Sequence, residues 1–214
     1  MYMYLMQLDK ISDRANENLR KFFDDLPETA HADGRYRLRR YSKVQMSLET
    51  MIYTTLEGNQ FTQSSEFNTF QGDIARTFES LSPELIRGFG FWELASRFTN
   101  TCRLPSENVI ETHQMRIRTL DELTPVSPEG AHQDGYDALC IASIARTNIT
   151  GGRLLVSREK DLEPVVNLQL KEGEVVYIND RALWHNATPI KRIDESKDGY
   201  MDVFVLTARY NATT

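Results

Sequence analysis

The sequence predicts a mainly β, α+β fold: a double-stranded β-helix, or jelly roll, with flanking helices in its N-terminal part. From residue 109 onward, short β-prone runs alternate with turns that contain glycine. Before residue 109, two segments place apolar side chains at helical spacing. Many short strands joined by glycine-containing turns are typical of β-sandwiches and barrels, so we expect helices packed at one end of a jelly roll.

The N-terminal part, residues 1–108, is expected to support this core with helices and a strand. Residues 8–23 and 83–98 carry the two helical patterns. Between them, Asp33 and the glycine after it mark a turn, and residues 35–44 have the alternation of a strand.

The C-terminal part, residues 109–214, is expected to supply the core strands and to complete a single domain over residues 1–214. Its strands are predicted from apolar runs bounded by turn residues. They cover residues 109–117, 139–145, 154–157, 165–170, 174–178 and 202–208.

Length, charge and hydropathy limit the function classes. A chain of 214 residues fits one large domain with its own core. Its 25 basic and 31 acidic residues give a net charge of −6, which argues against nucleic acid as a partner. No apolar run approaches the ~18 residues of a membrane span, and the first residues lack a secretory signal pattern. Cys102 and Cys140 form no disulfide framework, so a cytoplasmic location is expected.

Two of the four histidines belong to His-x-Asp pairs. His132 and Asp134 would share a face if they lie on a strand, and His185 follows after several predicted strands. Together they match the 2-His-1-carboxylate triad, which leaves open positions on Fe(II). The alternative is that His132 and His185 are ordinary buried histidines. The other pair, His31 with Asp33, precedes a glycine and has no suitable third ligand, so we interpret it as a surface turn.

Several further segments keep a characteristic order along the chain. They are Arg37–Ser42, Gln63–Asn68, Gly72 with Arg76–Phe78, His113–Arg116, Pro128–Asp134, Asn148–Gly152, His185–Pro189 and Asp202–Thr207. In this order the sequence resembles the small Fe(II)/2-oxoglutarate-dependent dioxygenases that include bacterial L-isoleucine 4-hydroxylase and other free amino-acid hydroxylases.

The resemblance implies both the cofactors and the reaction. Fe(II) would be held by His132, Asp134 and His185, with 2-oxoglutarate and O₂ at the remaining positions. The implied reaction couples decarboxylation of 2-oxoglutarate to hydroxylation of an unactivated C–H bond. The implied substrate is a small molecule, a free amino acid or a similar compound. The carboxylate of Asp134 favours hydroxylation or desaturation over halogenation, because related halogenases lack it.

The sequence departs from the family pattern at Met201. The family places there an arginine that binds the distal carboxylate of 2-oxoglutarate, and methionine cannot neutralise a buried carboxylate. Arg146 is the first substitute, since other branches place a basic residue at a similar spacing after the first ligand. Arg192, soon after His185, is the second. Either arginine could instead make ordinary contacts at a strand end or in a loop.

Two further arginines are candidates for substrate binding. Arg37 alternates with Arg35 and Arg39 along one face of a predicted strand, which indicates either a carboxylate site or a solvated edge. Arg116 lies on a predicted core strand, where it could reach a substrate or support a helix–sheet junction.

Other functions stay open at this stage. Met201 is also compatible with an iron oxygenase that uses a different cosubstrate, or with a non-catalytic jelly-roll binding protein. A metal hydrolase is less favoured, because no water-activating base accompanies the triad. The oligomeric state is open, a homodimer included.

Overall fold

The computed structural model describes residues 5–47, 50–65, 70–105, 107–120 and 123–210. Residues 66–68, which belong to one of the segments that carry the resemblance, lie outside this range. No helix among the described residues has the length and apolar character needed to cross a membrane.

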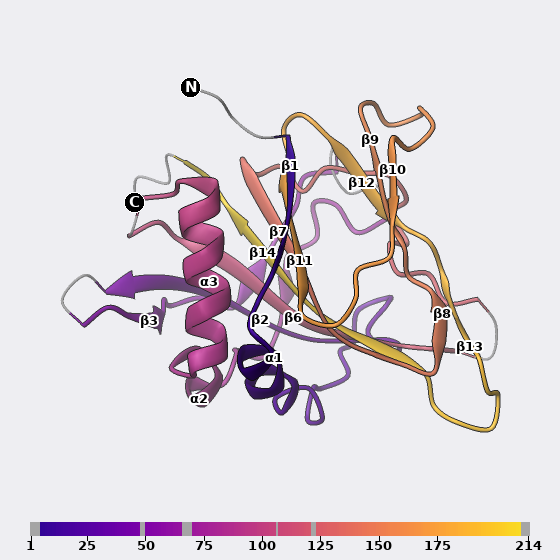
Figure 1. The fold of residues 1–214 in the computed structure, drawn as a ribbon, viewed down its shortest axis with the longest axis horizontal. Helices are drawn as coiled ribbons and strands as arrows, with labels where there is room; N and C mark the ends of the chain where they lie inside the picture. The colour runs from indigo at the N-terminus through magenta and orange to yellow at the C-terminus, as the bar shows by residue number, and fades with distance from the viewer. Residues whose placement is uncertain (1–4, 48–49, 66–69, 106, 121–122, 211–214) are drawn as a thin grey trace.

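A seven-stranded antiparallel sheet forms the centre of the molecule (Figure 1), in the order β1-β11-β7-β14-β6-β2-β3. The long strands β7, β14 and β6 lie side by side in its middle, so the sheet brings distant parts of the sequence together. The strands are β1 (Met6–Lys10), β2 (Arg37–Ser47), β3 (Ile52–Thr55), β6 (Ile110–Arg118), β7 (Ala138–Thr147), β11 (Glu174–Asn179) and β14 (Tyr200–Ala208).

Shorter sheets complete the β structure. Strands β10-β9-β12 form a three-stranded sheet, and β13-β8 and β4-β5 form pairs. The segments β8 to β10, β12 and β13 lie on the opposite side of the large sheet from the helices (Figure 1). Their bounds are β4 (Gln60–Phe61), β5 (Arg76–Thr77), β8 (Ile149–Gly151), β9 (Leu154–Ser157), β10 (Val166–Leu168), β12 (Trp184–Ala187) and β13 (Ile190–Arg192).

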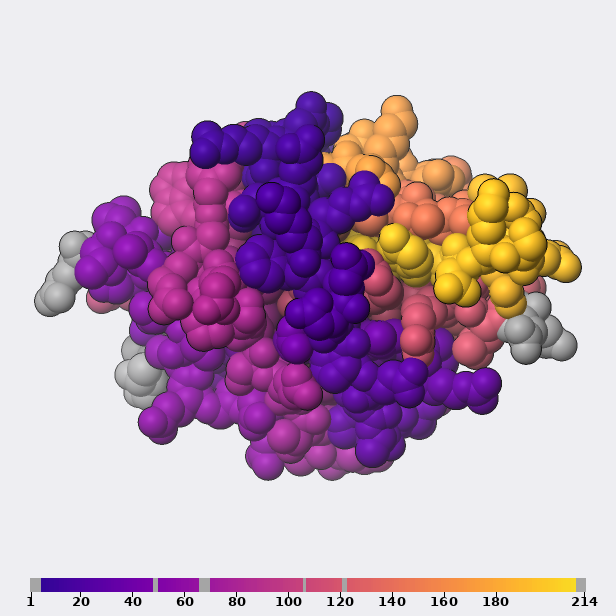
Figure 2. Space-filling model, turned by 90° about the horizontal axis from the view of Figure 1, so that it is seen from below, coloured from indigo at the N-terminus to yellow at the C-terminus, as the bar shows by residue number. Residues whose placement is uncertain are grey.

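Three helices cover the other side of the sheet: α1 (Asp13–Arg20), α2 (Pro83–Ile86) and α3 (Phe89–Cys102). The Ser12 side chain accepts a hydrogen bond from the backbone N–H of Ala15 and so caps α1. Seen from below, the N-terminal residues in indigo cover the middle of the surface beside the magenta helices (Figure 2).

Alternate residues of the central strands face two different cores. Cys140 and Ala142 of β7 pack with the helices, whereas Leu139 and Ile141 pack in a second core that includes Leu154 and Val156 of β9. This period of two is the consequence of the pleated strand. The large sheet is therefore buried on both faces, with the helical core on one side and the smaller sheets on the other.

The jelly-roll prediction is confirmed, but two helix predictions need correction. Residues 6–10 form β1, not the start of a helix, because they pair with β11 at the sheet edge and Ser12 caps the helix only afterwards. The helix predicted over 83–98 is interrupted at Gly88, whose backbone is extended and forms the N-cap of α3.

Replacing Phe204 by alanine should destabilise the protein strongly. Phe204 is fully buried between the helices and the sheet, and its ring contacts Phe23 edge-on at a centroid distance of 5.2 Å. Truncating such a ring costs about 3–5 kcal/mol. Urea unfolding should show this loss, while Phe89→Ala, a control on a side chain 42% exposed, should lose less than half as much. Equal losses would contradict the assignment of the core.

Candidate metal centre and cavity

His132 and His185 are brought together by their backbones. The N–H of His132 donates to the carbonyl of His185 at 3.0 Å, and the N–H of His185 donates back at 2.9 Å. The pair forms an isolated antiparallel bridge, with ring centroids 4.2 Å apart. Two residues 53 positions apart in the sequence thus become direct neighbours.

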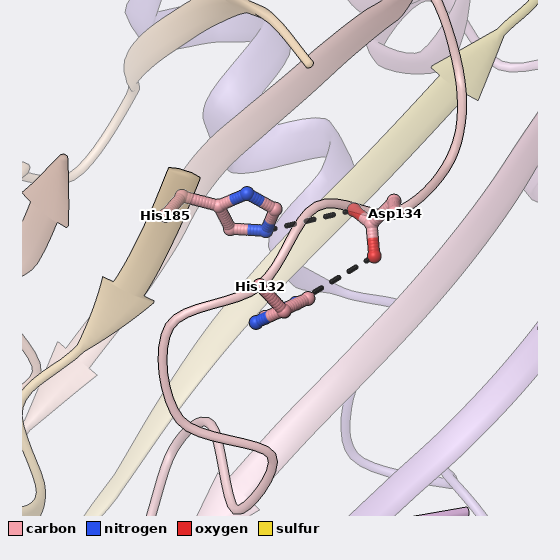
Figure 3. A group of neighbouring side chains, drawn as sticks. All are labelled: His132, Asp134 and His185. Carbon is pink, nitrogen blue, oxygen red and sulfur yellow. Dashed lines mark ion pairs between the residues drawn. The ribbon is translucent and has the colours of Figure 1, made fainter. Parts of the chain in front are cut away.

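Asp134 completes the group (Figure 3). Its two carboxylate oxygens lie 3.6 Å from Nε2 of His132 and 3.6 Å from Nε2 of His185. One ligand atom from each residue fits within 4.8 Å of the others. The sequence prediction placed His132 and Asp134 on one strand, but Asp134 lies in the irregular segment before β7. The loop turns the carboxylate toward both imidazoles.

The donor set fits a divalent iron. Two imidazole nitrogens and one carboxylate on one side of a cavity are the ligands that non-haem Fe(II) oxygenases use, with the remaining positions open. Nδ1 of His132 lies 2.9 Å from the carbonyl of Gly130, which leaves Nε2 to face Asp134. That contact fixes the ring orientation a metal ligand needs.

The electrostatics prepare two of the three ligands for a cation. Burial opposes charge on Asp134, but the hydrogen bond from His132 and the charge of His185 lower its pKa below the usual range. Burial and the charge of His132 lower the pKa of His185 to about 4. Burial would also lower that of His132, yet its hydrogen bond to Asp134 and the nearby carboxylates raise it to about 9. A bound metal must therefore displace a proton from His132.

Asp180 and Gln63 hold the ligand loop in place. The fully buried carboxylate of Asp180 accepts three successive backbone N–H bonds, from Asp134, Gly135 and Tyr136, at 2.8–3.0 Å. Nε2 of Gln63 donates to Oδ1 of Asp134 at 2.9 Å. These contacts orient the loop and the ligating carboxylate.

The triad opens into a cavity whose floor is the large sheet. Neighbouring strands contribute side chains in rows, since register places Arg37, Ile117, Met201 and Arg146 side by side across β2, β6, β14 and β7. The floor also contains Arg39, His113, Met115, Ile141, Ser143, Val203 and Val205. The two cations of this row are three strand spacings apart, roughly 14 Å, with apolar side chains between them.

Arg146 reaches the cavity because of a β-bulge. The register between β7 and β14 shifts at Asp202 and Val203, so that Val203 pairs with Ser143 while Met201 pairs with Arg146. The shift means that β7 carries one extra residue at this point. Without it, the side chain of Arg146 would point toward the helices, as that of Ala142 does. Its guanidinium donates to the carbonyl of Gly151 at 2.5 Å.

The opposite end of the cavity carries an ionic cluster. Asp33 is buried and pairs with Arg37 at 2.8 Å and Arg39 at 3.4 Å, while Arg76 and Glu129 also line the cavity. Burial opposes the charge of Asp33, but Arg37 and Arg39 lower its pKa. The predicted turn is present, but the prediction that Asp33 lies at the surface is wrong, because its carboxylate balances two buried arginines.

Two predicted site residues lie away from the cavity. Arg116 forms a two-pronged ion pair with the fully buried Asp202, at 2.6 and 2.8 Å, and also contacts Asp24. It occupies the helical side of β6, as the alternative of a helix–sheet support anticipated. Arg192 donates to the backbone carbonyls of Leu120 and Glu195 and is not among the cavity residues.

Sequence reasoning missed four residues of the site: Gln63, Arg76, Glu129 and Asp180. Glu129 lies three residues before His132, and Asp180 directly follows β11 and lies five residues before His185, so proximity along the chain was the available signal. Arg76 lies on β5 and Gln63 lies two residues after the end of β4, and nothing local in the sequence links these positions to the triad.

Comparison with known proteins agrees with this geometry. The profile of the 2OG-Fe dioxygenase family matches residues 20–207, so the chain belongs to this family. Its members use Fe(II), 2-oxoglutarate and O₂, and the chain carries the His-Asp-His group such chemistry requires. The chain is 24% identical to an L-isoleucine-4-hydroxylase from Bacillus thuringiensis over 85% of this chain and 78% of that protein.

Solved structures show the same fold. A BsmA homologue from Methylobium petroleophilum superposes with a TM-score of 0.77 at 26% identity, over 94% of this chain and 84% of that one. The structure of IDO from Bacillus thuringiensis gives a TM-score of 0.71 at 18% identity, over 95% and 94% of the two chains. The dioxygenase TqaL gives 0.70 at 15% identity, over 96% and 82%.

Replacing Asp180 by asparagine should weaken metal binding. The amide keeps one acceptor oxygen, but its N–H₂ group would face one or two of the three backbone N–H donors, so the loop that carries Asp134 loses its orientation. Loss of such a supporting contact typically costs 10–100-fold in metal affinity, which titration with Co(II) would measure. Asp161→Asn, on an exposed side chain, is the matched control. A folded Asp180→Asn protein with unchanged affinity would refute the role.

Proposed function

We propose that residues 1–214 form one jelly-roll domain that hydroxylates an unactivated C–H bond of a free amino acid. In this proposal Fe(II) binds to His132, Asp134 and His185, and Arg146 binds the distal carboxylate of 2-oxoglutarate. One observation carries the proposal: a single cavity contains the triad, a lone guanidinium on one side and an ionic cluster on the other.

The assignment of Arg146 rests on its position beside Met201, the residue that stands where the family has an arginine. The two residues are direct partners on neighbouring strands. A Cβ atom on Gly152 would lie 3.0 Å from Sδ of Met201 and 3.1 Å from Nη1 of Arg146, so both side chains end beside Gly152. A cation on β7 therefore reaches the region that a cation at position 201 on β14 would reach. A guanidinium suits a carboxylate because it can donate two parallel hydrogen bonds.

Bound iron with 2-oxoglutarate and O₂ supplies the oxidant for the hydroxylation. The side chains of the protein hold the substrate in position and exclude water from the cavity. Met115, Ile117 and Val203 on the floor, with Leu154 and Leu170 above, line the cavity with apolar groups. Such a lining excludes water and leaves orientation to the few polar groups at its ends.

The amino-acid class of the substrate is supported by the L-isoleucine-4-hydroxylase relative and by the charged end of the cavity. A cytoplasmic location is compatible with the free, buried thiols of Cys102 and Cys140. Met201 supports one alternative function, an iron oxygenase that uses another cosubstrate, because methionine adds apolar surface to the cavity.

Turnover with a panel of free amino acids tests the proposal. Anaerobically purified protein loaded with Fe(II) should convert 2-oxoglutarate to succinate faster when its substrate is present, with one oxygen added to the amino acid by mass spectrometry. Iron binding without affinity for 2-oxoglutarate would favour the rival cosubstrate. Absence of turnover with bound 2-oxoglutarate would favour a binding protein.

Removing the cation at position 146 should weaken binding of 2-oxoglutarate. Arg146→Gln should raise the Kd for 2-oxoglutarate by about 10- to 100-fold, the value of one charged hydrogen-bond pair, with little change in metal affinity. Arg192→Gln is the matched control and should leave this Kd unchanged. The reverse pattern would move the assignment to Arg192, and no effect in either variant would refute both.

A further inference from the structure

The ionic cluster, defined as Asp33, Arg37, Arg39, Arg76 and Glu129, lies almost entirely out of solvent. Arg39 and Arg76 are only 4% and 3% exposed, and the side chains of Arg37 and Glu129 are 10% and 9% exposed. All but Asp33 line the same cavity as the metal triad. Charged side chains are rarely buried to this degree unless they are paired.

The cluster is not balanced internally. Three guanidinium groups face two carboxylates, and the charge of Asp134 belongs to the metal centre. Burial and the charge of Arg37 lower the pKa of Arg39 to about 9, a value at which it still carries its charge at neutral pH. One net positive charge therefore remains beside the cavity, and a buried unpaired charge is costly. The carboxylate of a ligand would give these guanidinium groups a further partner.

Unused hydrogen-bonding atoms show where a ligand would bind. Nε of Arg37, and both Nε and Nη2 of Arg76, are buried without a hydrogen-bond partner among the described residues. The same holds for Oε2 of Glu129, whose nearest cation is Nη1 of Arg37 at 3.9 Å. Buried polar atoms in native proteins are normally satisfied, so unpaired donors and an unpaired acceptor at one cavity wall indicate a ligand with both kinds of group.

Glu129 also lies next to the metal centre. Its Oε1 is 3.4 Å from Nε2 of His132, while its Oε2 is within 4 Å of Arg37. It therefore connects the cluster to the triad. A ligand bound by Glu129 and the arginines would be held directly beside the iron position, where the orientation of its carbon chain decides which bond can react.

We infer that this cluster reads both charges of an α-amino acid: Arg37 and Arg76 bind the α-carboxylate, and Glu129 accepts the α-ammonium group. This inference rests on the proposed function and specifies it. Nη1 of Arg37 and Oε2 of Glu129 lie 3.9 Å apart, a separation that suits two charged ligand groups carried by one carbon atom. Asp33, which does not line the cavity, holds Arg37 and Arg39 in position through ion pairs.

The inference also restricts the substrate side chain. Among the described cavity residues, the charged groups are the triad, Arg146 and the cluster, together with His113. Burial and the nearby Arg39 lower the pKa of His113 far below its usual range, so it is neutral. No charge remains for a third ionic group, and the substrate class is an α-amino acid with free amino and carboxyl groups and an uncharged side chain.

A matched series of ligands tests the two contacts separately. The probes are L-isoleucine, L-leucine, L-norleucine and L-methionine, each as the free amino acid, the N-acetyl derivative and the amide. Wild-type protein should hydroxylate at least one free amino acid and prefer it over its N-acetyl and amide forms by about 10- to 100-fold in kcat/KM, the loss expected for one charged hydrogen bond.

Variants then assign each contact. Glu129→Gln should raise KM for the free amino acid about 10- to 100-fold but leave KM for the N-acetyl form unchanged, because that form lacks the ammonium group. Arg76→Gln should give the same pattern with the amide in place of the N-acetyl form. Glu163→Gln, on an exposed side chain, is the control. Co(II) affinity and the Kd for 2-oxoglutarate are measured in each variant.

The outcomes separate the two proposals. If no amino-acid form is oxidised, the proposed function fails. If free amino acids are oxidised but Glu129→Gln changes KM equally for the free and the N-acetyl forms, or changes KM for neither, the inference fails and the proposed function stands. If Glu129→Gln loses Co(II) affinity, Glu129 belongs to the metal centre and the inference is overturned.

Discussion

The pair of backbone hydrogen bonds between His132 and His185 is the constraint on which the site depends. It joins the loop before β7 to the strand β12, and it sets the distance between the two imidazoles before any metal binds. Asp134 then needs only one turn of loop, fixed by Asp180, to face both rings. A centre built this way is preorganised, because the ligands are held by backbone pairing and buried hydrogen bonds rather than by the metal alone.

The large sheet gives this centre its surroundings. Alternation along each strand sends one set of side chains to the helical core and the other to the cavity. Antiparallel register then converts four sequence positions, Arg37, Ile117, Met201 and Arg146, into one row. His132, Asp134 and His185 line the same cavity, whose floor has a cation at each end and apolar groups between.

The sequence predicted the fold and the grouping of the triad, because short β runs and His-x-Asp with a distant histidine are local patterns. It could not show that Arg116 faces the helices, since the face of a strand residue depends on register. The bulge that turns Arg146 toward the cavity has no signature of its own. Burial of Asp33 depends on arginines brought close by β2, so its isolated motif gave the wrong environment.

A crystal structure of the protein with Mn(II), 2-oxoglutarate and an amino-acid substrate under anaerobic conditions would show directly which side chains hold each group. We expect the metal on His132, Asp134 and His185, with the distal carboxylate of 2-oxoglutarate hydrogen-bonded to Arg146 and the amino acid on the side of Glu129. The distal carboxylate on Arg37 or Arg76, or the metal bound elsewhere, would contradict it.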